Sequence, residues 1–114
     1  MTEQRKHDRI FLDRAISIKL SNGQIAKARL VNLSTGGLGI VYPVPAEIGS
    51  TLGLHFQLPN KDNEPVTIHC KGIARHTHVH NNEYLSGFEF SQISEEDRNI
   101  ISQFVQRKRT ATNF

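Results

Sequence analysis

Short runs of alternating apolar and polar residues fill most of the chain from residue 15 to residue 90, and they restrict the fold more than any other feature. In residues 51–58, for example, every second side chain is leucine or phenylalanine. Successive side chains of a strand point to opposite faces, so this pattern is typical of a strand with one buried face. The pattern predicts strands at residues 15–20, 24–33, 38–42, 51–58, 66–78 and 84–90.

The periodicity changes after residue 93. Ser94 offers a hydroxyl that can cap a helix, and acidic residues follow it in the first turn, where the helix dipole favours them. Apolar residues then recur at helical spacing, namely Ile100, Ile101, Phe104 and Val105. An amphipathic helix is therefore predicted over residues 93–109. Six strands followed by a helix predict a mainly β fold, a six-stranded antiparallel β-barrel with the helix packed on it.

The length of 114 residues fits one domain. A flexible N-terminal arm is expected at residues 1–14 and the barrel at residues 15–92. The helix follows at residues 93–109 and a tail at residues 110–114. No apolar run approaches the roughly 20 residues of a membrane span, and the first residues are polar, so neither a span nor a signal peptide is expected. The single cysteine, Cys70, lies in an apolar alternation and fits a packed thiol in the reducing cytoplasm.

Adjacent glycines, Gly36 and Gly37, interrupt the strand pattern. They weaken a strand because they add backbone freedom and supply no side chain. We expect their backbone N–H groups to turn outward and form a concave anion site. Asn32 and Ser34 are two residues apart, so a strand would place both side chains on one face. This set can read the edge of a base but cannot neutralise a phosphate.

The missing positive charge can come from Arg5 and Arg9. The guanidinium group is a planar fork that suits phosphate oxygens, the O6/N7 edge of guanine and stacking on a base. These arginines match the pattern RxxxR, and residues 32–37 match (D/N)xSxxG. With both motifs in this order, the chain resembles the PilZ domains, which are bacterial receptors for cyclic di-GMP. The resemblance extends to residues 47–50, residues 85–90 and the helix start, and it covers nearly the whole chain.

The resemblance also implies residue roles and a fold. PilZ domains are six-stranded antiparallel barrels with a flanking helix, their arginines hold phosphates and guanines, and their second motif contacts a guanine. The family binds the ligand as one molecule or as a stacked pair. The implied ligand-binding residues are Arg5, Arg9, Asn32, Ser34, Gly36 and Gly37. Further candidates are Gln4, where the family often has another arginine, Lys6, and Arg75 near a hairpin end.

His76, His78 and His80 alternate, so a strand would place three imidazoles on one face. Same-face residues of one strand lie roughly 6.5–7 Å apart, which is awkward for three ligands around one ion. These histidines are therefore predicted to face solvent, and no metal or cofactor is expected. His55 and His69 are predicted to point outward from their strands.

No enzyme motif is present. No local motif pairs Ser34 with a histidine, and the chain lacks a phosphate-binding loop of the G-x-x-x-x-G-K-(S/T) type. We therefore expect a non-enzymatic cytoplasmic receptor for cyclic di-GMP whose N-terminal arm and surface change on binding, so that an effector protein responds. The alternatives are a PilZ-like interaction module that binds no ligand and a barrel that binds single-stranded nucleic acid. The second is unlike this chain, because few aromatic residues fall at exposed positions.

Overall fold

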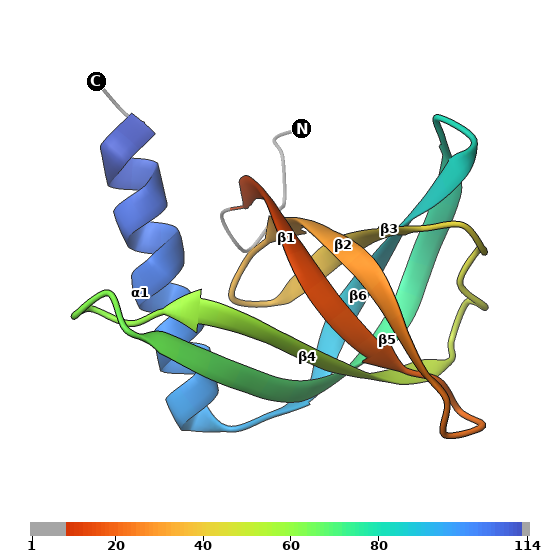
Figure 1. Cartoon of the computed structure of the whole chain (residues 1–114), viewed down its shortest axis with the longest axis horizontal. Coiled ribbons are helices and arrows are strands. Elements are labelled where there is room, and N and C mark those ends of the chain that lie inside the picture. Colours follow the sequence, from red (N-terminus) through yellow and green to blue (C-terminus); the bar gives the residue numbers. More distant parts are fainter. Residues whose placement is uncertain (1–8, 113–114) are drawn as a thin grey trace, which may run out of the picture.

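The computed structural model describes residues 9–112. Within this range the chain forms six strands and one helix, which are β1 (Ile10–Lys19), β2 (Ile25–Leu33), β3 (Gly37–Tyr42), β4 (Thr51–Pro59), β5 (Pro65–His80), β6 (Glu83–Ile93) and α1 (Glu95–Thr112). The strands pair antiparallel into a closed barrel in the order β1-β2-β3-β6-β5-β4 (Figure 1). The predicted fold class is confirmed.

Strand β1 begins at Ile10, so the expected arm of residues 1–14 is too long. Ile10 pairs with Leu33 and is buried in the core, and Phe11 pairs with Asn32. The ladder shifts register between Phe11 and Arg14, as at a β-bulge. This irregularity, together with polar residues at positions 13 and 14, hides the strand from a search for strict alternation. The predicted site residues Gln4, Arg5 and Lys6 lie outside the described residues.

The core fills the barrel and continues beneath the helix. Ile101, Phe104 and Val105 of α1 are buried and belong to the same apolar cluster as the inward residues of the strands. Cys70 is buried as predicted, and burial raises the pKa of its thiol to about 12. The helix begins at Glu95 and extends past residue 109 to Thr112. No helix within residues 9–112 combines the length and the apolar character that crossing a membrane requires.

Short-range contacts set the ends of the elements. The Asp97 backbone N–H donates to the Ser94 hydroxyl at 3.0 Å, which is the predicted helix cap. The β5–β6 hairpin turns through Asn81 and Asn82, which have φ values of 50° and 68°. Two positive φ values are what a two-residue hairpin turn requires, and asparagine tolerates them better than most residues.

Candidate functional site

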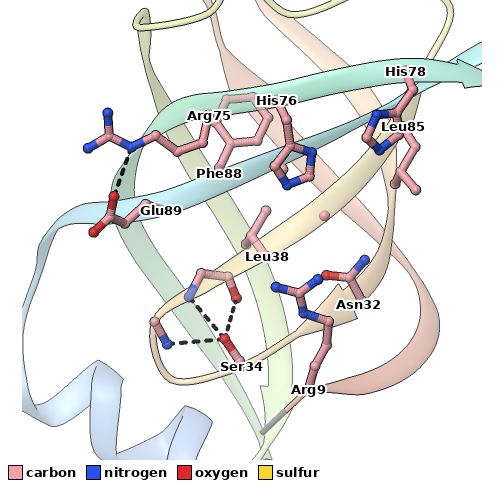
Figure 2. Close-up of a pocket in the computed structure, with 14 residues that line it drawn as sticks. Arg9, Asn32, Ser34, Leu38, Arg75, His76, His78, Leu85, Phe88 and Glu89 are labelled. Carbon is pink, nitrogen blue, oxygen red and sulfur yellow. Dashed lines mark hydrogen bonds and ion pairs between the residues drawn. The ribbon is translucent and has the colours of Figure 1, made fainter. Parts of the chain in front are cut away.

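A pocket of about 480 Å³ opens on the wall of the barrel where β2, β3, β6 and β5 run side by side (Figure 2). It contains all six of the predicted site residues that the structure describes. Those lining it are Arg9, Asn32, Ser34, Gly36, Gly37 and Arg75. The other lining residues are Leu38, Gly39, His76, His78, Leu85, Gly87, Phe88 and Glu89. Its volume falls within the roughly 300–1,000 Å³ of pockets that hold small molecules.

Ser34 organises the loop between β2 and β3. Its hydroxyl oxygen accepts hydrogen bonds from the backbone N–H groups of Gly36 and Gly37, each at 3.2 Å. The Ser34 N–H donates to the Gly37 carbonyl at 2.9 Å. The prediction that the glycine N–H groups turn outward is therefore wrong, because the buried serine hydroxyl accepts both. Ser34 fixes the shape of the loop that borders the pocket.

The glycines allow close packing against β6. A Cβ atom at Gly37 would overlap the carbonyl oxygen of Phe88, and the Gly36 carbonyl accepts from the Phe90 N–H at 2.9 Å. Neither Gly36 nor Gly37 has a positive φ. In the described part of the chain, the glycines with positive φ are Gly23 and Gly49. Position 37 therefore requires glycine because there is no room for a side chain.

A row of paired residues crosses four strands at the centre of the pocket. Asn32 of β2 pairs with Gly39 of β3, Gly39 pairs with Gly87 of β6, and Gly87 pairs with His76 of β5. A Cβ atom at Gly39 would overlap the Asn32 amide, and one at Gly87 would overlap the His76 imidazole. The side chains of Asn32 and His76 therefore lean toward each other over a pair of glycines, which we call the glycine floor.

The two arginines that line the pocket differ in their carboxylate partners. Arg9 stands just before β1, and Figure 2 shows its guanidinium group beside the Asn32 side chain. Arg75 pairs with Glu89, its Nε lying 2.8 Å from a carboxylate oxygen. Both of these side chains are more than half exposed, at 54% and 59%, so their ion pair adds little to stability. Among the described lining residues, Arg9 is thus the cation that has no carboxylate partner in the pocket.

His76, His78 and His80 are exposed, as predicted, and the first two also border the pocket. His76 and His78 line the pocket, with ring centroids 5.2 Å apart and planes within 14° of each other. Desolvation lowers the pKa of His76, and the nearby charges of His78 and Arg9 lower it further, which favours a neutral imidazole. No sequence pattern places His76 in the pocket, because its position depends on Gly87 pairing across the sheet and on a register shift between Ala74 and His76.

The outward direction of His55 and His69 is confirmed, since they pair across β4 and β5 on the barrel surface with ring centroids 4.4 Å apart. In the part of the chain that the structure describes, no three histidine, cysteine or acidic side chains gather as metal ligands. The pocket instead combines an amide, two imidazoles and two guanidinium groups around the glycine floor. Such a set suits an anionic ligand that carries flat, polar rings.

Comparison with known proteins identifies the family. The family model described as the PilZ domain matches residues 3–107 of this chain. An uncharacterized protein of Aquifex aeolicus (strain VF5) is 26% identical over 107 residues, which cover 93% of this chain and 50% of that protein.

Solved structures share the fold. The inhibitor of motility MotI/DgrA of Bacillus subtilis superposes with a TM-score of 0.88 and 18% identity, covering 99% of this chain and 55% of that chain. The PilZ domain of YcgR from Escherichia coli, solved with c-di-GMP, superposes with a TM-score of 0.66 and 16% identity, covering 97% and 98% of the two chains. This chain therefore spans about half the length of the Aquifex and Bacillus relatives.

Proposed function

Since the chain belongs to the PilZ domain family, we propose that it is a receptor for cyclic di-GMP and that the pocket on β2, β3, β6 and β5 is the binding site. The observation that carries this proposal is the convergence of two separated sequence motifs. Arg9, from the first motif, lines the same pocket as Asn32, Ser34, Gly36 and Gly37, from the second. Arg9 is exposed and precedes β1, so its side chain is not part of the buried core.

Each part of the ligand has a matching group. Arg9 would hold a phosphate or the O6/N7 edge of a guanine, as the charge-assisted bonds of a guanidinium group allow. The Asn32 amide would read the edge of a guanine. Arg5, which lies outside the described residues, would add a second guanidinium group from the same motif. A protein solved as a complex with this ligand, YcgR, supports the choice of cyclic di-GMP.

We propose further that the bound dinucleotide acts by altering a surface that an effector protein reads, without being consumed. Arg9, the last residue of the first motif, immediately precedes β1, so a ligand held by both motifs would tie the N-terminal segment to the loop of residues 34–36 between β2 and β3, which we call the glycine loop. The ordered segment and the ligand would then form a new surface. The two states are the chain with and without the N-terminal segment held against the loop. The ligand favours the first state only to the extent that it binds that state more tightly.

Titration calorimetry with cyclic di-GMP, cyclic di-AMP and GMP tests the function. We expect cyclic di-GMP to bind most tightly and Arg9→Ala to weaken it at least tenfold, because charge-assisted hydrogen bonds contribute roughly 1.5–3 kcal/mol each. Arg29→Ala is the matched control, since Arg29 is an exposed barrel arginine paired with Asp13 outside the pocket. Equal affinity for the adenine dinucleotide, or an Arg9→Ala variant within twofold of the unchanged protein, would contradict the proposal.

A further inference from the structure

We infer that His76 is a base-contacting residue, whose imidazole lies against a guanine of the bound dinucleotide on the side of the glycine floor opposite Asn32. This inference rests on the proposed function and adds a residue that neither sequence motif contains. It starts from the cross-strand row Asn32, Gly39, Gly87 and His76.

Along this row, the side chains of Asn32 and His76 flank two glycines. Neighbouring strands lie about 4.7–4.9 Å apart, so the β2 and β5 backbones at Asn32 and His76 are separated by about 14 Å. Gly39 and Gly87 between them contribute no side chains, and the amide and the imidazole reach inward above them. The amide and the imidazole therefore cover the two glycines, and a flat ring that enters the pocket lies against these side chains, with Asn32 on one side and His76 on the other.

The position of His76 is a consequence of Gly87. Any Cβ atom at residue 87 would overlap atoms of the imidazole, including its Nε2. The His76 side chain is exposed to the pocket rather than buried in the core, so its place is not required for packing of the barrel. Figure 2 shows the ring projecting from β5 over the pocket, with Leu38 and Asn32 across from it.

The chemistry of His76 suits a base better than a phosphate. A neutral imidazole has one N–H donor and one nitrogen acceptor, which can meet the acceptors or the donors on a guanine edge, and its ring can pack on a base. Desolvation and the neighbouring His78 and Arg9 favour that neutral form. Arg9, on the Asn32 side of the pocket, supplies the positive charge for phosphate instead.

The test compares His76→Ala with His80→Ala. His80 belongs to the same strand, is exposed and does not line the pocket, so its removal matches the chemical change without touching the site. Calorimetry with cyclic di-GMP is run for both variants and for Arg9→Ala at low and high salt. We expect His76→Ala to weaken binding about tenfold at both salt concentrations, because a neutral contact is not screened, and to leave the melting temperature unchanged. The His80→Ala variant should bind like the unchanged protein.

Three outcomes would overturn the inference. They are a His76→Ala affinity within twofold of the unchanged protein, a loss that disappears at high salt as expected for a phosphate contact, and an equal loss in the His80→Ala variant. Each of these leaves the proposed function standing as long as the unchanged protein binds cyclic di-GMP. Failure of the unchanged protein to bind would overturn the proposed function and this inference together.

Discussion

The Arg98 guanidinium group donates a hydrogen bond of 2.6 Å from Nη1 to the carbonyl oxygen of Thr35. Thr35 lies inside the glycine loop, and Arg98 lies in the first turns of α1. The start of the same helix is held to β5, because the Asp97 carboxylate accepts from the His69 N–H at 3.1 Å. The loop that borders the pocket is thus joined directly to the C-terminal helix.

Removing this link should loosen the loop. We expect Arg98→Ala to lower the free energy of unfolding by about 1 kcal/mol, since the bond is charge-assisted but exposed, and to weaken cyclic di-GMP binding severalfold. Urea unfolding and calorimetry measure the two effects. Asn99→Ala, a change at an exposed neighbour, is the control. Unchanged affinity in Arg98→Ala would show that the loop keeps its shape without the helix.

Two glycines of β3 should respond differently to alanine. At Gly37 the new Cβ atom would meet the backbone carbonyl of Phe88, which cannot move freely, so we expect a loss of about 1–3 kcal/mol in stability. At Gly39 it would meet the Asn32 side chain, which can rotate away, so we expect a near-normal melting temperature but much weaker ligand binding. Thermal unfolding and calorimetry on both variants distinguish the two effects. A Gly39→Ala variant that binds normally would mean that the Asn32 position is not needed.

Acid should destabilise the barrel through His55. Desolvation, then His69 and Lys19, lower the pKa of His55 in the folded chain. As the pH falls below the ordinary histidine pKa of about 6.5, the unfolded chain therefore binds more protons than the folded chain. The stability associated with neutral His55 is fully present above that pH, and the free energy of unfolding falls as the pH is lowered. We expect His55→Gln to lose less stability than the unchanged protein between pH 7.5 and pH 5.5 in urea unfolding. His80→Gln serves as the control, and equal losses in all three proteins would refute the prediction.

Much of the fold could be predicted because it depends on local patterns. The alternation in β4 and the helical spacing of Ile101, Phe104 and Val105 both reflect one buried face, which the sequence records directly. The alternating pattern predicts a strand only from residue 15, whereas β1 begins at Ile10, because a register shift breaks the alternation before that point. Irregular pairing leaves no periodic signal.

The candidate site was predictable mainly where a motif marked it, and Arg75 is the lining residue predicted outside both motifs. Arg9 and the residues around the glycines were found by their spacing, and they do line one pocket. His76 was not found, because its place depends on which strand lies beside β6 and on a glycine there. The outward N–H groups expected at Gly36 and Gly37 were wrong, since the pattern could not show that Ser34 accepts both bonds.

Aspartate in place of Asn32 should keep or strengthen ligand binding. Guanine presents two adjacent donors, and a carboxylate can accept both, whereas the Asn32 amide has one acceptor oxygen. Burial opposes the change, because Asn32 is only 8% exposed and an ionised carboxylate loses solvation there. Arg9 lies beside it and offsets that cost. We therefore expect calorimetry to show affinity for cyclic di-GMP that is kept or increased by up to about threefold, with a slightly lower melting temperature without ligand. A tenfold loss of affinity would show that residue 32 does not face the donors of the guanine edge.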